Sequence, residues 1–244
     1  MRTLVITPTY VEAVNIDEHL RLVRKAAPDV DILVVDDNSP DGTADIAEAT
    51  ARELGQVEIL RRPDKTGLGS AYRAGFTVGV ERGYEVLVQM DADHSHDQSV
   101  LPVLLAEIDA GADLVIGSRY VPGGSVPHWP WYRRALSKYG NLYVRFVLGT
   151  PVKDATAGYR AYRADALKAI DYASTRATGY GIQMELAYRT WRWGGRIREI
   201  PITFTDRVRG HSKMTWHIFF EELLLVTWWG VRDRWRRWRA RARS

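Results

Sequence analysis

Residues 84–96 have the sequence YEVLVQMDADHSH, an apolar run that ends abruptly in two carboxylates separated by one small residue. A run rich in Val and Leu that stops at a polar cluster is typical of a buried parallel strand that delivers a loop at its carboxyl end. Ligands of open α/β sheets bind at the carboxyl ends of such strands. This stretch therefore predicts both a fold class and the sheet edge on which a site would lie.

The two carboxylates, Asp91 and Asp93, are expected to face the same side. Residues i and i+2 of an extended backbone point the same way, and Ala92 between them turns away. Hard oxygen ligands suit Mg²⁺ or Mn²⁺, and magnesium is usually held by one or two carboxylates while substrate phosphates complete its shell. The pattern therefore predicts a metal site for a phosphate-bearing substrate. The alternative is a solvated acidic loop that caps the next helix, which the position directly behind a buried strand disfavours.

The composition is that of an ordinary globular chain. Its 244 residues are 45% hydrophobic and 26% charged, which suffices for one domain with a sizeable core, with or without a C-terminal appendage. The absence of Cys excludes a disulfide framework, a thiolate metal site and a catalytic thiol. The apolar segment at residues 3–7 is too short for a signal peptide, so we expect a cytoplasmic protein.

Strand-like and helix-like segments alternate along the chain. This alternation predicts an α/β fold with a mainly parallel, Rossmann-like central sheet flanked by helices. We expect strands at residues 3–7, 31–35, 57–60, 84–90, 113–117 and 196–204, and a loop that enters a short strand at residues 153–163. We expect helices at residues 15–27 and 100–109, from the loop at Gly67 to about residue 82, from the loop at His128 to about residue 148, and at 181–193.

Polar loops follow several of the expected strands. Residues 36–43, DDNSPDGT, are turn-forming and add a second acidic cluster at the same sheet edge. Gly67 and Gly69 open a helix and would allow an anion to approach its N-terminus. A Rossmann oxidoreductase remains a minor alternative, because a dinucleotide fold carries its glycine fingerprint after the first strand, where residues 8–12 are PTYVE here. Arg119 follows the strand at 113–117 and either offers a fork for phosphate or forms a surface ion pair.

The C-terminal part of the chain is basic and aromatic. Residues 206–213, DRVRGHSK, form a basic loop long enough to fold over a pyrophosphate, and residues 232–239 are RDRWRRWR. A spanning helix needs roughly 20 apolar residues, and the helical stripe that begins at residue 215 is shorter and carries charges. We therefore expect residues 1–214 to form a domain and residues 215–244 to be an amphipathic helix with a basic tail on an anionic membrane surface. The alternatives are a core helix with a disordered tail, and an RNA-binding tail.

These motifs together resemble those of the dolichol-phosphate, or polyprenol-phosphate, mannose synthases of glycosyltransferase family 2, which have a GT-A fold. The motifs in chain order are residues 8–12 (PTYVE), 36–43 (DDNSPDGT), 67–69 (GLG), 91–93 (DAD), 117–120 (GSRY) and 206–213 (DRVRGHSK). The resemblance implies transfer of mannose from GDP-mannose to a polyprenyl phosphate, with inversion and with Mg²⁺ or Mn²⁺. It also implies peripheral attachment to the cytoplasmic face of a membrane, with or without an integral-membrane partner protein, and no nucleic-acid partner.

The resemblance also implies roles for individual residues. The guanosine end of the donor would be held by Pro8, Tyr10, Glu12, Val35 and Asp37. The divalent ion on the diphosphate would be carried by Asp91 and Asp93, with Ala92 between them in the nucleotide-sugar site. Arg207 and Lys213 would clamp the pyrophosphate, and the lipid phosphate would be received by Arg119, Arg133 and Ser137. Among these, Asp91, Asp93 and Arg119 would be the catalytic residues.

Some alternatives stay open at this point. Ser95 stands where some relatives place a Gln that ligates the metal, so the third protein ligand is open. A near neighbour in the family would use another nucleotide sugar, such as UDP-glucose or UDP-GlcNAc, on the same acceptor. A protein of a different class, a catalytically idle module that binds membranes or nucleic acid, would bind anionic surfaces without turnover.

Overall fold

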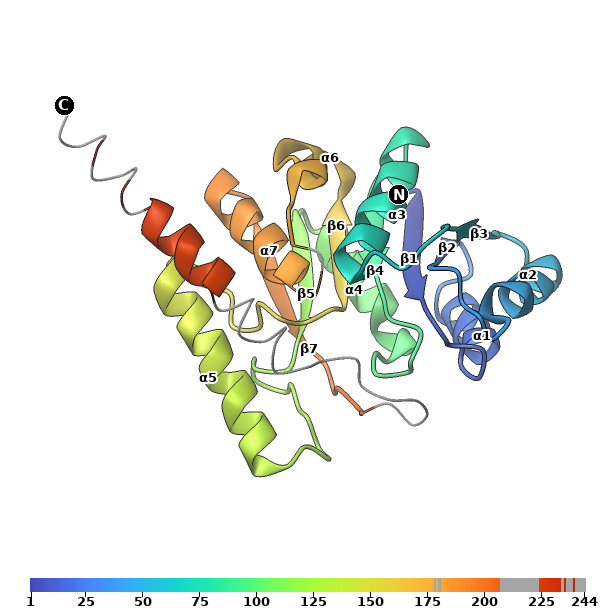
Figure 1. Ribbon diagram of the computed structural model, residues 1–244, viewed down its shortest axis with the longest axis horizontal. Helices are drawn as coiled ribbons and strands as arrows, with labels where there is room; N and C mark the ends of the chain where they lie inside the picture. The colour runs from blue at the N-terminus through green and yellow to red at the C-terminus, as the bar shows by residue number, and fades with distance from the viewer. Residues whose placement is uncertain (178, 180, 207–223, 234, 236–238, 240–244) are drawn as a thin grey trace.

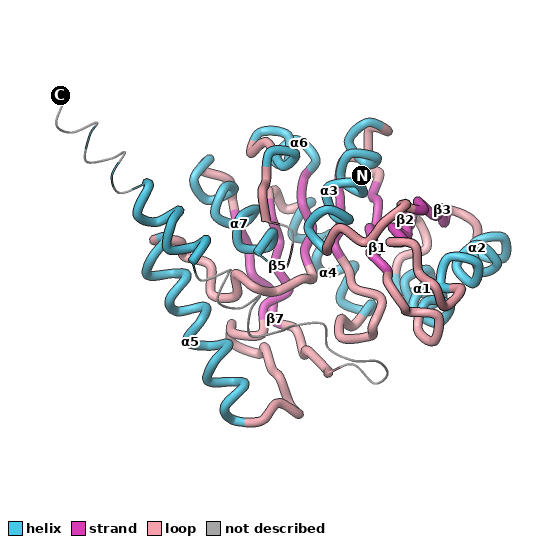
Figure 2. Tube along the Cα trace, in the orientation of Figure 1, coloured by secondary structure: helices cyan, strands magenta, loops and turns pink. Residues whose placement is uncertain are grey.

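The computed structural model describes residues 1–177, 179, 181–206, 224–233, 235 and 239. Its centre is a seven-stranded sheet in the order β3-β2-β1-β4-β6-β5-β7, with helices on both faces (Figures 1 and 2). The strands are β1 (Thr3–Thr9), β2 (Asp31–Asp36), β3 (Val57–Arg61), β4 (Val86–Gln89), β5 (Leu114–Ser118), β6 (Arg160–Arg163) and β7 (Ile197–Pro201). The helices are α1 (Ile16–Ala26), α2 (Thr43–Leu54), α3 (Leu68–Glu81), α4 (Leu101–Asp109), α5 (Trp131–Leu148), α6 (Ala164–Ala169) and α7 (Gly181–Trp193), with short 3₁₀ helices η1 (Gln98–Val100) and η2 (Tyr172–Ser174). Residues 224–233 are also helical.

The sheet is mainly parallel, as the alternation of strands and helices predicts. Strand β1 pairs in parallel with β2 and β4, β2 pairs in parallel with β3, and β5 pairs in parallel with β7. Strand β6 lies between β4 and β5 and runs antiparallel to both. The pattern up to residue 117 does not indicate this insertion, because the inserted strand comes from the second half of the chain.

The side chains along β4 and the residues after it alternate between the two faces of the sheet, and this alternation decides the face on which Asp91 lies. Leu87 joins the core under α3 and α7, whereas Val88, Met90 and Ala92 join the core under α1 and α4. Asp91 lies between two residues of the second series and therefore faces the α3 side, as expected for alternating side chains. Ala92 therefore lies on the opposite side from Asp91, which meets Tyr72 on α3.

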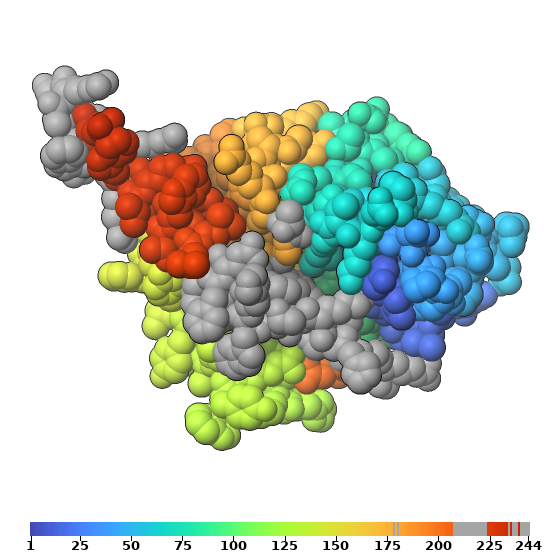
Figure 3. Space-filling model, in the orientation of Figure 1, coloured from blue at the N-terminus to red at the C-terminus, as the bar shows by residue number. Residues whose placement is uncertain are grey.

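Helix α5 and residues 224–233 lie side by side at one end of the molecule, in yellow-green and red (Figures 1 and 3). The Tyr143 hydroxyl is 2.6 Å from Thr227 Oγ1. A Cβ at Gly230 would lie 2.6 Å from Val147 Cγ1, so only glycine permits this close approach. No helix within the described residues is long and apolar enough to cross a membrane.

The predicted amphipathic segment begins at residue 215, and its residues up to 223 lie outside the described part of the chain. The described part has one face in the core, where Trp229 stacks on Tyr188 with ring centroids 6.4 Å apart. Its other face exposes Leu224, Trp228 and Val231. This helical segment therefore packs against the domain on its inner face and exposes apolar side chains on its outer face.

Candidate active site

The loop that follows β4 is held in place by hydrogen bonds to its carboxylates and backbone. The Tyr72 hydroxyl on α3 donates to Asp91 Oδ1 at 2.9 Å, and the Asp91 backbone N–H donates to His96 Nδ1 at 3.2 Å. Asp93 Oδ1 accepts the backbone N–H of Ser95 at 3.1 Å and the Ser95 hydroxyl at 2.5 Å. Both carboxylates are thus oriented by the protein itself.

This loop fits a divalent cation. Burial raises the pKa of the Tyr72 hydroxyl well above its usual value, and the nearby charges of Asp91 and Asp93 raise it further, so Tyr72 remains a hydrogen-bond donor. Among the residues that the structure describes, no three His, Cys, Asp or Glu side chains gather into a group that could hold a metal ion. A pair of carboxylates is what Mg²⁺ uses when substrate phosphates supply further ligands. The donor set therefore suits a cation that arrives with a diphosphate.

Gly158 lies close to the acidic loop. A Cβ at this position would lie 3.4 Å from Asp91 Oδ2 and 3.3 Å from the His96 ring. That ring is itself fixed, because His96 stacks on the buried Tyr159 with centroids 5.1 Å apart. A side chain at position 158 would therefore contact both the His96 ring and the Asp91 carboxylate.

The residues expected to hold the nucleoside lie at the carboxyl ends of β1 and β2. Pro8 and Val35 pair across the two strands, and Val35 is fully buried, so its side chain lies in the core. The Lys65 ammonium lies 3.9 Å from the centroid of the Tyr10 ring. Glu12, in the loop between β1 and α1, is 8% exposed. The structure brings these predicted residues to one corner of the sheet.

Asp37 is paired with an arginine that sequence reasoning did not single out. Arg62 Nη1 donates to Asp37 Oδ1 at 2.7 Å, with 13% and 7% of the two side chains exposed. Arg62 Nη2 also donates to Ser70 at 2.7 Å and to Thr66. Burial raises the pKa of Asp37, and the charge of Arg62 opposes this shift. Arg62 therefore links Asp37, after β2, to the glycine-containing start of α3.

Arg119 forms an ion pair, but the pair is buried rather than at the surface. Arg119 Nε and Nη2 donate to the two oxygens of Asp154 at 2.8 Å and 2.6 Å, and the Arg119 backbone N–H adds a third bond at 2.9 Å. The exposed fractions of the two side chains are 8% and 0%. Burial alone would raise the pKa of Asp154, but the charge and hydrogen bonds of Arg119 outweigh it and lower the pKa. Asp154 thereby fixes the direction of the guanidinium.

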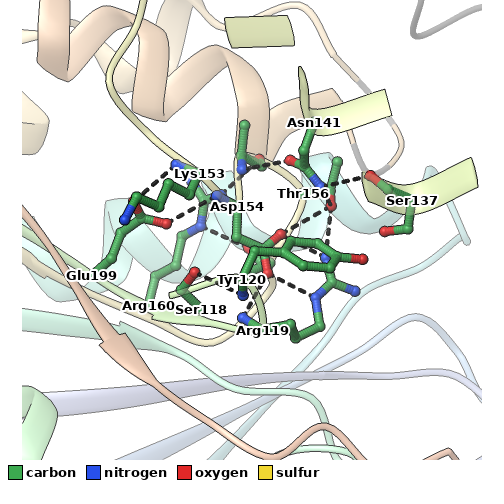
Figure 4. A network of polar contacts seen from close by, with 12 residues as sticks. Ser118, Arg119, Tyr120, Ser137, Asn141, Lys153, Asp154, Thr156, Arg160 and Glu199 are labelled. Carbon is green, nitrogen blue, oxygen red and sulfur yellow. Dashed lines mark hydrogen bonds and ion pairs between the residues drawn. The ribbon is translucent and has the colours of Figure 1, made fainter. Parts of the chain in front are cut away.

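The Arg119–Asp154 pair belongs to a network that joins several elements (Figure 4). Thr156 Oγ1 accepts from Arg119 Nη2 at 2.7 Å, and Asn141 on α5 donates to Thr156 at 3.3 Å. Glu199 on β7 accepts the backbone N–H of Asp154 at 2.9 Å. The guanidinium is thus held jointly by α5, β7 and the loop that precedes β6.

The other two residues expected to receive the lipid phosphate lie on α5. The Ser137 side chain lies near the Tyr120 hydroxyl (Figure 4). Burial raises the pKa of Tyr120, and Ser137 and the charge of Arg119 offset only part of this shift. The Arg133 guanidinium lies 4.0 Å from the centroid of the Trp129 ring, and that of Arg119 lies 5.5 Å from the same ring. The structure therefore gathers Arg119, Arg133 and Ser137 around two aromatic side chains.

Phe204 joins the acidic loop to this arginine cluster. Its ring meets His96 edge-on at 6.0 Å and Trp129 at 5.6 Å between centroids. The Arg119 guanidinium lies 5.5 Å from the Phe204 ring. The two parts of the site are therefore contiguous.

Several residues of the site were missed by sequence reasoning. Tyr72, Arg62, His96 and Asp154 act on predicted residues through contacts between segments, and no spacing along the chain indicates such contacts. The stretch KDATAGYR at 153–160 was expected only to be a loop that enters a strand. The predicted residues Arg207 and Lys213 lie outside the described part of the chain.

The mainly parallel sheet, with an acidic loop after β4, fits a glycosyltransferase of the GT-A type. The chain belongs to glycosyl transferase family 2, whose model matches residues 4–171. It is 52% identical over 241 residues to the undecaprenyl-phosphate mannosyltransferase of Micrococcus luteus, covering 99% of each chain. It is 50% identical over 234 residues to the polyprenol monophosphomannose synthase of Mycolicibacterium smegmatis, covering 96% of this chain and 88% of that one. It is 36% identical over 242 residues to the dolichol-phosphate mannosyltransferase of Pyrococcus furiosus, covering 96% and 66%.

Solved structures confirm the fold. The glucosyl-3-phosphoglycerate synthase of Mycobacterium tuberculosis, in complex with Mn²⁺, UDP-glucose and phosphoglyceric acid, matches with a TM-score of 0.66 at 18% identity, covering 93% of this chain and 79% of that one. The mannosyltransferase PcManGT of Pyrobaculum calidifontis, in complex with GDP-Man and Mn²⁺, matches with a TM-score of 0.64 at 17% identity, covering 95% and 64%. At these identities the likeness concerns the fold alone.

Proposed function

We propose that this chain is a polyprenol-phosphate mannosyltransferase that transfers mannose from GDP-mannose to a polyprenyl phosphate. One observation carries the proposal. Phe204 connects a two-carboxylate loop, suited to a cation on a diphosphate, to an arginine cluster suited to a second phosphate. The two relatives at 52% and 50% identity bear the names undecaprenyl-phosphate mannosyltransferase and polyprenol monophosphomannose synthase, which supports this sugar and this acceptor.

In the proposed reaction, an oxygen of the acceptor phosphate attacks C1 of mannose. The bond from C1 to the β-phosphate oxygen breaks, GDP leaves, and the configuration at C1 inverts. The acceptor is already an anion at neutral pH, so proton removal by a general base is not required. Arg119 and Arg133 would hold the attacking phosphate in line. Asp91 and Asp93 would hold a divalent cation that supplies positive charge at the leaving diphosphate when bound.

We infer that the enzyme works at the cytoplasmic surface of a membrane, where a polyprenyl acceptor resides. Trp131, Tyr139, Leu142 and Phe146 on α5 are 80%, 68%, 54% and 78% exposed. Their spacing of eight, eleven and fifteen residues from Trp131 places them on one face of the helix. Aromatic side chains with neighbouring cations are typical of helices that lie in the interface of a bilayer. Ser137 and Arg133, the proposed acceptor residues, belong to the same helix.

The proposed function is tested by the transfer of radiolabel from GDP-mannose into organic-extractable lipid. Purified protein is incubated with polyprenyl phosphate and Mg²⁺ or Mn²⁺, beside the Asp93→Asn variant and parallel reactions with UDP-glucose and UDP-GlcNAc. We expect metal-dependent labelling from GDP-mannose alone and its loss in the variant. Labelling from a UDP-sugar instead would support the same transfer reaction with a different sugar donor. Absence of labelling from every donor by folded, lipid-bound protein would contradict the proposal.

A further inference from the structure

Asp206 accepts hydrogen bonds from side chains at the proposed acceptor site. Arg133 Nη1 donates to both oxygens of the Asp206 carboxylate at 2.9 Å each. The indole N–H of Trp129 donates to Asp206 Oδ1, also at 2.9 Å. A guanidinium and an indole therefore converge on one anionic group.

These donors form a built anion site. Trp129 is 6% exposed, and its ring is fixed between the edge of Phe204 and the Arg133 guanidinium. Trp129 lies two residues before the 18-residue helix α5, whose N-cap is Pro130, and Arg133 lies in the first turn of that helix. Unpaired backbone N–H groups and the helix dipole favour an anion at this end of a helix. Charge and geometry therefore favour a bound anion even without Asp206.

The carboxylate that fills the site is partly exposed to solvent. The side chains of Arg133 and Asp206 are 41% and 39% exposed, so solvent reaches the pair. Exposed ion pairs of this kind are weak. A phosphate monoester carries more charge than a carboxylate and has three oxygens for the same donors, and arginine binds both groups through the same fork.

We propose that Trp129 is a phosphate-binding residue of the acceptor site and that Asp206 is an internal carboxylate displaced by the acceptor's phosphate. This inference rests on the proposed function and adds to it one binding residue and one competing anion. In the alternative, Asp206 stays bound to Arg133 when the acceptor binds and positions the guanidinium. The two views predict opposite effects when the charge of Asp206 is removed.

The test is the binding of farnesyl phosphate to the full chain, measured by titration calorimetry in parallel with inorganic phosphate. Asp206→Asn keeps the shape of the side chain and removes its charge, and we expect it to bind farnesyl phosphate roughly two- to five-fold more tightly than the wild type. Trp129→Phe keeps an aromatic ring without the N–H, and we expect about ten-fold weaker binding. Asp165→Asn removes the same charge from an ion pair with Lys168 on α6 and serves as the matched control, with unchanged affinity.

The outcomes separate the inference from the proposed function. Tighter binding of both farnesyl phosphate and inorganic phosphate by Asp206→Asn supports displacement at the phosphate. If the wild type binds farnesyl phosphate and Asp206→Asn binds it equally or more weakly, the inference is overturned while the proposed acceptor stands. If neither the wild type nor any variant binds farnesyl phosphate, the proposed acceptor is overturned together with the inference.

Discussion

At the scale of a single residue, the orientation of Asp91 depends on Tyr72. The Tyr72 hydroxyl donates to Asp91 Oδ1 at 2.9 Å from a fully buried position. Groups that orient a metal ligand typically change metal affinity or activity by about 10- to 100-fold when removed. We therefore expect Tyr72→Phe to need at least about ten-fold more Mn²⁺ for half-maximal transfer, as measured by titrating the metal in the radiolabel assay.

A matched control for this variant exists elsewhere in the chain. The Tyr84 hydroxyl donates to Asp31 Oδ2 at 2.8 Å, away from the acidic loop. Tyr84→Phe removes the same kind of bond and should leave the metal requirement unchanged. Equal Mn²⁺ dependence of Tyr72→Phe and the wild type would show that Tyr72 does not orient a metal ligand.

His19 makes the stability of the fold depend on pH. It is fully buried on α1, with Thr7 Oγ1 and the Gln98 amide at 3.1 Å and 3.2 Å from its two ring nitrogens. Burial, with the nearby charge of His94, lowers its pKa from 6.5 to about 3. The unfolded chain takes up a proton near pH 6.5, whereas the folded chain does so only near pH 3. The stability contributed by neutral His19 is therefore complete above pH 6.5 and is lost as the pH falls from 6.5 towards 3.

His19→Gln cannot take up this proton. Between about pH 7 and about pH 4.5, we expect the wild type to lose about 3 kcal/mol more unfolding free energy than the variant, at about 1.4 kcal/mol per pKa unit. Urea unfolding of both proteins at the two pH values measures the difference. Parallel losses in the two proteins would mean that His19 titrates normally in the folded state.

At the scale of an element, α5 serves two sides of the molecule. Its inner side carries Asn141, which reaches Thr156 and accepts the backbone N–H of Ala155 at 2.8 Å. Its outer side carries the exposed aromatic residues, including Trp131 and Tyr139. A helix that contacts both the bilayer and the Arg119 network would position the lipid phosphate relative to the sheet.

The outer face of α5 is expected to contribute directly to membrane binding. Replacing Trp131 and Tyr139 together with Ala removes two large apolar groups, and burial of one such side chain stabilises by roughly 1.5 to 3 kcal/mol. We expect at least about ten-fold weaker partitioning onto liposomes in a sedimentation assay. Val103→Ala changes an exposed apolar side chain on α4 and should have no effect. Unchanged partitioning of the double variant would show that the outer face of α5 does not contribute to membrane binding.

At the scale of the whole molecule, the sequence predicts those features of the fold and the site that depend on the spacing of neighbouring residues. Asp91 and Asp93 could be placed at a sheet edge because the alternation of a strand and its abrupt end are written in consecutive residues. The partner of Arg119 could not be predicted, because Asp154 lies 35 residues away and meets it only in the folded chain. The position of the antiparallel strand β6 could not be predicted for the same reason. It lies between β4 and β5, which precede it by tens of residues in the chain.

Charge is the property of the whole molecule that bears on the membrane. The chain has a net charge of +4, and residues 234–244 contain six Arg and no acidic residue. Each basic residue near an anionic surface contributes about 1 kcal/mol, and this contribution falls off within a Debye length. Ending the chain after Asp233 keeps the carboxylate that accepts a hydrogen bond from Tyr188 and removes these cations.

We expect the shortened protein to bind vesicles containing phosphatidylserine at least about ten-fold more weakly at low salt. At about 1 M salt, where charges are screened within roughly 3 Å, the two proteins should bind alike, because the exposed apolar face of α5 is intact in both. Vesicle sedimentation at the two ionic strengths, with neutral vesicles as the control, measures the difference. The same salt dependence in both proteins would mean that the electrostatic attraction comes from the folded domain, where Arg133 and Arg134 lie in the first turn of α5.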